Sequence, residues 1–263
     1  MRLQLAGLAL GLAAATTAGA GVVIQMADRD VKSGQQSDRD VWYAQGALLR
    51  VDRLDDAGHV QRMSILRDGA IWEVDVERRT YTRIDKAAMQ GQMGVMDERM
   101  KAALASMPPE RRAKMEQMMQ NMQQAHHDYA WSDTGKSDRV GQYGCRTWEG
   151  RRDNKPSEEV CVAPTSSLPG GDELLATMRQ ASKVVQDVLS ATPQGGRMFG
   201  EYIKRFEQMN GFPVRTRHLS GGQFSRESIV TKVERQSLPA DKFEIPKGYA
   251  EKPLGKPGAG GDD

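Results

Sequence analysis

The chain has 263 residues, 38% hydrophobic and 27% charged, so it is long enough to bury one sizeable core. Its 37 basic and 35 acidic residues leave a formal net charge of +2 at pH 7. This balance argues against nucleic acid as a partner and against a polybasic contact with membranes.

The first 20 residues predict a secretory signal peptide. They carry one basic residue, Arg2, an apolar run over residues 3–15, and the small-residue exit AGA at 18–20. The apolar run is too short to span a membrane, and no later segment is long and apolar enough to do so. We expect a soluble, periplasmic mature protein that begins near Gly21.

Residues 42–84 have the pattern of successive β-strands joined by short turns. Asp68-Gly69 lies between two alternating runs and predicts a two-residue hairpin, because a type I′ turn needs positive φ at both central positions. In the run AIWEVDV, Trp72 and Val74 share one face and the acidic residues between them share the other. The pattern predicts an antiparallel meander with one dry face and one wet face.

Residues 86–128 predict a helical hairpin inserted between two stretches of sheet. Methionines recur at helical spacing in both arms, and nine of the chain's 15 methionines lie between residues 86 and 127. Pro108-Pro109 separates the arms, because a residue before proline leaves the α region and Pro109 can begin the next helix. We expect the methionine face to lie across the dry face of the sheet.

The chain has two cysteines, Cys145 and Cys161, on neighbouring strand runs separated by the polar turn RRDNKPS. An exported chain folds where such a pair usually closes, so we predict a disulfide that staples this hairpin. Its loop of roughly 15 residues would contribute about 3 kcal/mol on the chain-entropy account.

A second helical insertion is predicted over residues 171–210. It begins with a long amphipathic stripe that includes Val185 and continues, after Pro193, with a shorter run that includes Phe206. Two further strand runs surround Gly221-Gly222, and the Pro/Gly-rich residues 250–263 are expected to be disordered.

The sequence shows no motif of a known active site, so we predict a protein that is not an enzyme and needs no cofactor. The methionine helices leave three interpretations open. They are plain core packing, one wall of a groove for an acyl chain or a partner segment, and a copper site. The copper site would use Met119, Met122 and His126, with His127 beside them.

The predicted groove lies between the sheet and the helices and accepts a hydrophobic ligand, a lipid or acyl chain, or an envelope protein. The residues expected to line it are apolar and come from a strand and from both helical insertions. They are Trp72, Val74, Met96, Met100, Met115, Met119, Met122, Val185 and Phe206.

Several stretches of the chain carry a resemblance to a known family. They are ILRDGAIWEVDVERRTYTRID, MPPERRAKMEQMM, VGQYGCRTWEGRRDNKPSEEVCVA, GFPVRT and FEIPKGY. With them the chain resembles a family of bacterial periplasmic proteins known only as a domain of unknown function, similar in predicted fold to the lipoprotein carriers LolA and LolB. The resemblance covers most of residues 21–249. It implies a strongly curved, incomplete antiparallel β-barrel with helices on its concave side, and it brings no assigned site.

The prediction is thus one α+β domain over residues 21–249, with a curved antiparallel sheet, a LolA-like incomplete β-barrel of roughly ten strands. Its two helical insertions, residues 86–128 and 171–210, are expected to cover the concave face. The oligomeric state is left open.

Overall fold

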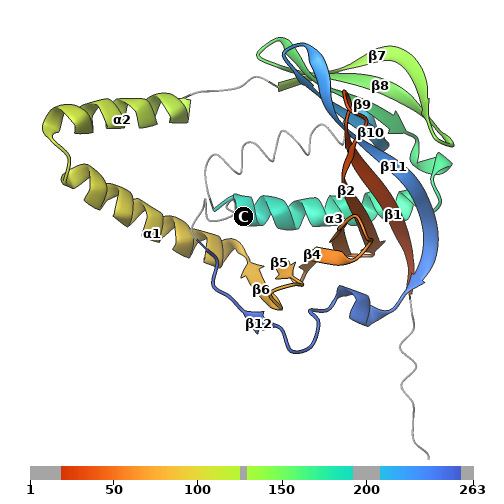
Figure 1. Cartoon of the computed structure of the whole chain (residues 1–263), viewed down its shortest axis with the longest axis horizontal. Coiled ribbons are helices and arrows are strands. Elements are labelled where there is room, and N and C mark those ends of the chain that lie inside the picture. The colour runs from red at the N-terminus through yellow and green to blue at the C-terminus, as the bar shows by residue number, and fades with distance from the viewer. Residues whose placement is uncertain (1–18, 125–128, 192–207, 256–263) are drawn as a thin grey trace, which may run out of the picture.

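The computed structural model describes residues 19–124, 129–191 and 208–255, and it shows an α+β fold built on one curved, unclosed sheet (Figure 1). Within these residues the sheet has 12 strands in the order β12-β6-β5-β4-β3-β2-β1-β11-β10-β9-β8-β7. The strands are β1 (Gly19–Asp30), β2 (Gln36–Gln45), β3 (Leu48–Leu54), β4 (Val60–Arg67), β5 (Ala70–Asp75), β6 (Thr80–Ile84), β7 (Tyr129–Val140), β8 (Tyr143–Arg152), β9 (Lys155–Ala163), β10 (Phe212–Ser220), β11 (Gln223–Leu238) and β12 (Ala250–Glu251). The predicted fold class is confirmed.

The sheet consists of two antiparallel meanders that meet where β1 pairs with β11. One meander runs from β1 to β6 and the other from β7 to β11. Register shifts interrupt several pairings, including that of β1 with β11 after Gln25, and such bulges increase local twist and bending. The sheet therefore curls toward a barrel without closing.

The hairpin predicted at Asp68-Gly69 is confirmed, with φ of 51° and 69° at the two positions. A second tight turn, which the sequence pattern did not predict, lies at Gly46 with φ of 56°. That turn splits VWYAQGALLRVD, which has the length of one strand, into the end of β2 and most of β3. The predicted number of roughly ten strands is therefore too low.

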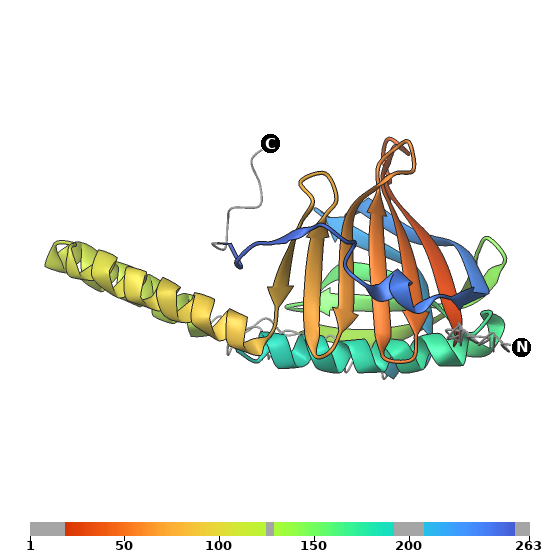
Figure 2. The same cartoon turned by 90° about the horizontal axis from the view of Figure 1, so that it is seen from below.

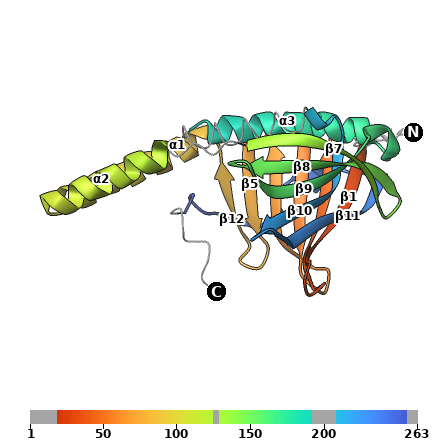
Figure 3. The same ribbon diagram turned by 90° about the horizontal axis from the view of Figure 1, so that it is seen from above.

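Helix α3 (Gly171–Leu189) lies across one end of the strands, as Figures 2 and 3 show from opposite sides. Its buried residues recur at helical spacing and include Leu174, Ala181 and Val188. Leu174 and Ala181 belong to a core, here called the α3 core, that also contains Val22 and Ile24 of β1. The part of the second helical insertion that the structure describes thus covers the sheet, as predicted.

The chain after β11 covers the other face of the sheet. This C-terminal segment, defined as residues 239–251, crosses the strands of the first meander and ends as β12, which pairs in parallel with β6 (Figure 2). Phe243 is 1% exposed in a second core, together with Ile65, Val74 and Leu238. Both faces of the meander are therefore dry in part, and the prediction of one wet face is wrong. Ala250 and Glu251, which were expected to be disordered, form β12 instead, and residues 256–263 of the predicted tail lie outside the described residues.

Helices α1 (Lys86–Ala105) and α2 (Pro109–Gln124) form the predicted hairpin, but it projects away from the sheet (Figures 1 and 2). Asp85 caps α1 by accepting a hydrogen bond from the Ala88 backbone N–H at 2.8 Å. α1 contacts β6 and α3, and none of its residues is buried. The expectation that the methionine helices lie across the dry face of the sheet is therefore not met.

Candidate binding surface

Large apolar side chains are exposed on both arms of the α1–α2 hairpin. Five of them form what we call the methionine surface: Val95 (49% exposed), Met96 (40%), Met100 (38%), Met115 (39%) and Met118 (58%). Exposed apolar side chains gathered in one region mark contact sites more often than isolated ones do. This concentration is the strongest indication of binding in the described residues.

The hairpin is held together at its joint. Arg112 of α2 donates hydrogen bonds to the backbone carbonyls of Leu104 at 2.9 Å, Ala105 at 3.0 Å and Met107 at 3.3 Å. Leu104 and Ala105 are the last two residues of α1, whose carbonyls have no partner within the helix, and Met107 lies in the turn that follows. Beyond this joint the two helices diverge (Figure 1).

Charges of both signs surround the apolar side chains. On α1, Lys101 pairs with Asp97 at 2.7 Å and with Glu98 at 3.3 Å. Across residues 86–124 there are six basic and four acidic residues and no aromatic residue. The hairpin therefore exposes methionine side chains among charged residues whose signs nearly balance. Flexible thioethers of this kind can adapt their shape to an apolar segment of a partner.

The residues predicted to line one groove lie in three separate places. Met96, Met100 and Met115 are exposed on the hairpin, and Met119 is half-buried on α2. Val74 is buried and Trp72 half-buried under the C-terminal segment. Val185 packs against the core beneath α3. Phe206, the side chain of Met122, and His126 with His127 lie outside the described residues.

The reason for this separation is the alternation of strand β5. Ile71 packs with the α3 core, whereas Trp72, the next residue, packs with the core that contains Phe243. A period of two tells which residues share a face, but it does not tell which distant element covers that face. The groove as predicted, lined by the strand and by both insertions together, is not assembled by the described residues.

The predicted disulfide is confirmed between Cys145 of β8 and Cys161 of β9, with Cα atoms 5.4 Å apart. Both residues are buried in the α3 core. The bridge links two strands that are already paired, and with both cysteines engaged the chain has no free thiol.

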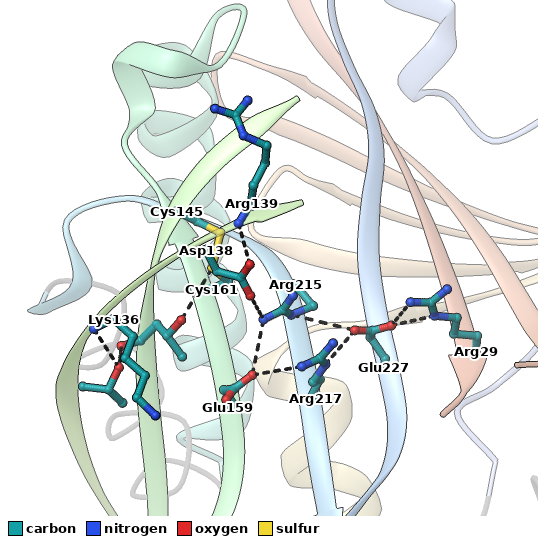
Figure 4. Close-up of polar contacts among 12 residues, drawn as sticks. Arg29, Lys136, Asp138, Arg139, Cys145, Glu159, Cys161, Arg215, Arg217 and Glu227 are labelled. Carbon is teal, nitrogen blue, oxygen red and sulfur yellow. Dashed lines mark hydrogen bonds and ion pairs between the residues drawn. A yellow bond between two sulfur atoms is a disulfide. The ribbon is translucent and has the colours of Figure 1, made fainter. Parts of the chain in front are cut away.

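A network of ion pairs lies on the face of the sheet that carries the disulfide (Figure 4). Register places it there, because Arg215 lies opposite Cys161 and directly opposed residues share a face. Glu227, 2% exposed, accepts hydrogen bonds from Arg29 Nε at 2.6 Å and Arg217 Nε at 2.7 Å. Arg215 Nη2 donates to Asp138 at 2.7 Å.

The carboxylates of this network are held in their charged form. Burial alone would raise the pKa of Glu227, but the hydrogen bonds from Arg217 and Arg29 outweigh it and lower that pKa. The pKa of Asp138 is lowered by the backbone N–H of Arg139 and then by Arg215. These carboxylates and arginines pair with one another and so link β7, β10, β11 and β1. Such an arrangement is typical of ion pairs that stabilise a fold. No sequence pattern predicts this network, since its members lie far apart in the chain.

One polar cavity of about 260 Å³ lies beside the first turn of α3. Its charged lining is already paired, since Arg235 lies 3.3 Å from Glu173, and Thr165 donates to Asp172 at 2.8 Å. The cavity does not match the apolar ligand that the sequence predicts. In the part of the chain that the structure describes, no group of three or more His, Cys, Asp and Glu residues could hold a metal ion.

A family model matches residues 75–249, more than half of the chain. The chain belongs to the DUF4412 family, described as a domain of unknown function. The resemblance found in the sequence is thereby confirmed. Comparison of this DUF4412 protein with curated proteins gives no match. Among the helices described here, none combines the length and hydropathy needed to cross a bilayer.

Three solved structures illustrate how distant the structural matches of this DUF4412 protein are. An uncharacterized conserved protein from Thermus thermophilus is 9% identical, with 90% of this chain and 91% of that one covered and a TM-score of 0.45. A chain of the MucA/MucB complex of Pseudomonas aeruginosa is 11% identical, with 87% and 56% covered and a TM-score of 0.36. A LolA superfamily protein from Nitrosomonas europaea is 6% identical, with 86% and 90% covered and a TM-score of 0.27.

Proposed function

We propose that this protein is a non-catalytic, extracytoplasmic binding protein that holds an apolar segment of a partner protein on its methionine surface. The observation that supports the proposal is a projecting hairpin whose first helix buries no residue and whose two arms expose five large apolar side chains. Helices in proteins owe most of their stability to a packed apolar face. A hairpin without such packing gains that stability when a partner covers it.

Helix α3 closes one end of the space within the curved sheet, and this favours the methionine surface over an acyl-chain cavity at that end. Leu174 and Ala181 of α3, 0% and 3% exposed, occupy the space against β1. A lipid chain bound there would have to displace a helix that buries five of its residues. The exposed hairpin requires no such displacement.

The composition of the hairpin favours a protein segment over a membrane surface. Helices that lie on membranes usually combine a strongly basic polar face with Trp, Phe or Leu on the apolar face. Residues 86–124 have no aromatic residue and one leucine, and their six basic residues are accompanied by four acidic ones. Flexible thioethers instead adapt to side chains of varied shape, which is typical of surfaces that bind several related peptides.

The extracytoplasmic location rests on two features that agree. The sequence predicts a cleaved signal peptide, and the Cys145–Cys161 disulfide is of a kind that persists in oxidising compartments. The partner we propose is accordingly an envelope protein.

Binding of a fluorescein-labelled amphipathic peptide of leucine and glutamine, followed by fluorescence anisotropy, tests the proposal. We expect saturable binding that is lost when Met96, Met100, Met115 and Met118 are all replaced by Gln. The control is Val31→Gln, which removes an apolar side chain of similar exposure, 37%, from the β1–β2 turn.

Two further measurements test whether the hairpin binds a lipid surface or a second copy of the chain instead of a peptide. Flotation with phosphatidylethanolamine–phosphatidylglycerol vesicles detects a lipid surface, and sedimentation velocity detects a second copy of the chain. Absence of saturable peptide binding, or equal loss of binding in the Val31→Gln control, refutes the proposal. Circular dichroism establishes that each variant is folded.

A further inference from the structure

We propose that Met96, Met100, Met115 and Met118 are sulfoxidation sites and that their oxidation releases the bound partner. The four residues supply all the sulfur of the methionine surface. The release depends on the proposed function, whereas the oxidation of these sites follows from their exposure alone.

The four hairpin methionines differ sharply in exposure from methionine in the core. They are 38% to 58% exposed, while Met63 of β4 is 7% exposed and packs with Phe243. Oxidation of a thioether needs contact between the sulfur and an oxidant from solution, so susceptibility follows exposure. Met118, at 58%, should react first and Met63 last.

No thiol of this chain competes for the oxidant. The sequence contains two cysteines, and both are engaged in the Cys145–Cys161 disulfide. In an oxidising compartment, sulfur oxidation of this protein therefore falls on its methionines, and among those whose exposure the structure describes, the four hairpin residues are the most exposed.

The reaction requires a peroxide as oxidant. A lone pair of the methionine sulfur attacks the terminal oxygen of hydrogen peroxide, the O–O bond breaks, and after proton transfer water leaves. Sulfur loses two electrons and becomes a sulfoxide, and the peroxide is reduced. A methionine sulfoxide reductase reverses the step with two thiols, which become a disulfide as the oxygen leaves in water.

The sulfoxide changes the surface without damaging the core. It turns a flexible apolar side chain into a polar one whose oxygen accepts hydrogen bonds from water. Because these four side chains are 38% to 58% exposed before oxidation and belong to neither core, their sulfoxides leave both cores intact. The loss therefore falls on the complex with the partner.

Peroxide treatment of the full mature protein, followed by peptide mapping with mass spectrometry, tests the sites. We expect the four hairpin methionines to oxidise at least about tenfold faster than Met63. Equal rates at Met63 and at the hairpin would overturn the assignment, and this readout does not depend on peptide binding.

Anisotropy with the leucine–glutamine peptide tests the release. We expect the oxidised protein to lose affinity at least about tenfold, and reductase treatment to restore it. A variant with Leu at all four positions keeps an apolar surface that peroxide cannot oxidise, so it should bind before and after treatment alike. An equal loss in this variant would overturn the switch, whereas no binding by the untreated wild-type protein would refute the proposed function instead.

Discussion

Replacing Phe243 with alanine tests whether the C-terminal segment is an integral part of the fold. Phe243 is 1% exposed and packs with Ile65, Val74 and Leu238 in the second core. Full burial of an aromatic side chain removes roughly 150–250 Å² from water. Truncation of a buried Phe to Ala lowers the free energy of unfolding by about 3–5 kcal/mol, because transfer and cavity costs add.

The truncation leaves the backbone anchors of the segment in place. Arg50 donates to the Lys242 carbonyl at 2.8 Å and Arg67 donates to the Phe243 carbonyl at 3.2 Å, and neither bond needs the aromatic ring. The measured loss therefore reports the packing of the side chain.

Urea unfolding followed by circular dichroism measures this loss. The matched control is Phe224→Ala on β11, where a half-buried ring lies under Arg217 with the guanidinium carbon 5.2 Å from its centre. We expect the control to lose about 1–2 kcal/mol. A Phe243→Ala loss of less than about 1 kcal/mol, or one no larger than that of the control, would refute the reasoning that this segment completes a core.

Three further predictions concern the ion-pair network and the disulfide. Glu227→Gln should lower the free energy of unfolding by about 2–3 kcal/mol, because it removes the charge that pairs with Arg29 and Arg217. Urea unfolding measures this loss. The control is Glu149→Gln, which removes an exposed pair with Arg151 and should cost less than about 1 kcal/mol. The lowered pKa values of Glu227 and Asp138 mean that the unfolded state binds more protons in acid, so their stabilisation is complete above about pH 4.5 and is lost as the pH falls through the folded-state values. Melting temperatures between neutral and acidic pH check this, and a Glu227→Gln variant with the same pH slope as wild type would contradict it. Replacing both Cys145 and Cys161 with Ser should cost about 3 kcal/mol, and reductant should lower the urea midpoint of the wild type while leaving that of the double variant unchanged.

Local chemistry explains what could be predicted from the sequence. Positive φ at Asp68 and Gly69 follows from a turn that few residue pairs tolerate. The joint between α1 and α2 follows from the effect of Pro108-Pro109 on backbone conformation. The pairing of Cys145 with Cys161 follows from the chain having no other cysteine. Each of these features depends on a short stretch or on simple counting.

Contacts between distant parts of the chain explain what could not be predicted. The face of Trp72 and Val74 is dry, as its alternation indicates, but the element that covers it is a segment about 170 residues later, as the Tyr249–Val76 contact shows. The methionines of α1 and α2 recur at helical spacing, but no local rule shows whether another element covers them or they stay exposed. Glu227 has no sequence signal because its partner Arg29 lies 198 residues away.

The pairing of β1 with β11 also determines the order in which the protein can fold. Gln25 of β1 accepts a hydrogen bond from Thr231, 206 residues later, so the centre of the sheet joins the first strand to one of the last. Contacts of such long sequence separation form slowly because the intervening chain must be ordered first. During synthesis β1 can pair with β2 early, but its other edge stays open until β11 has been made. That unpaired edge is where a stalled or truncated chain would be prone to aggregate.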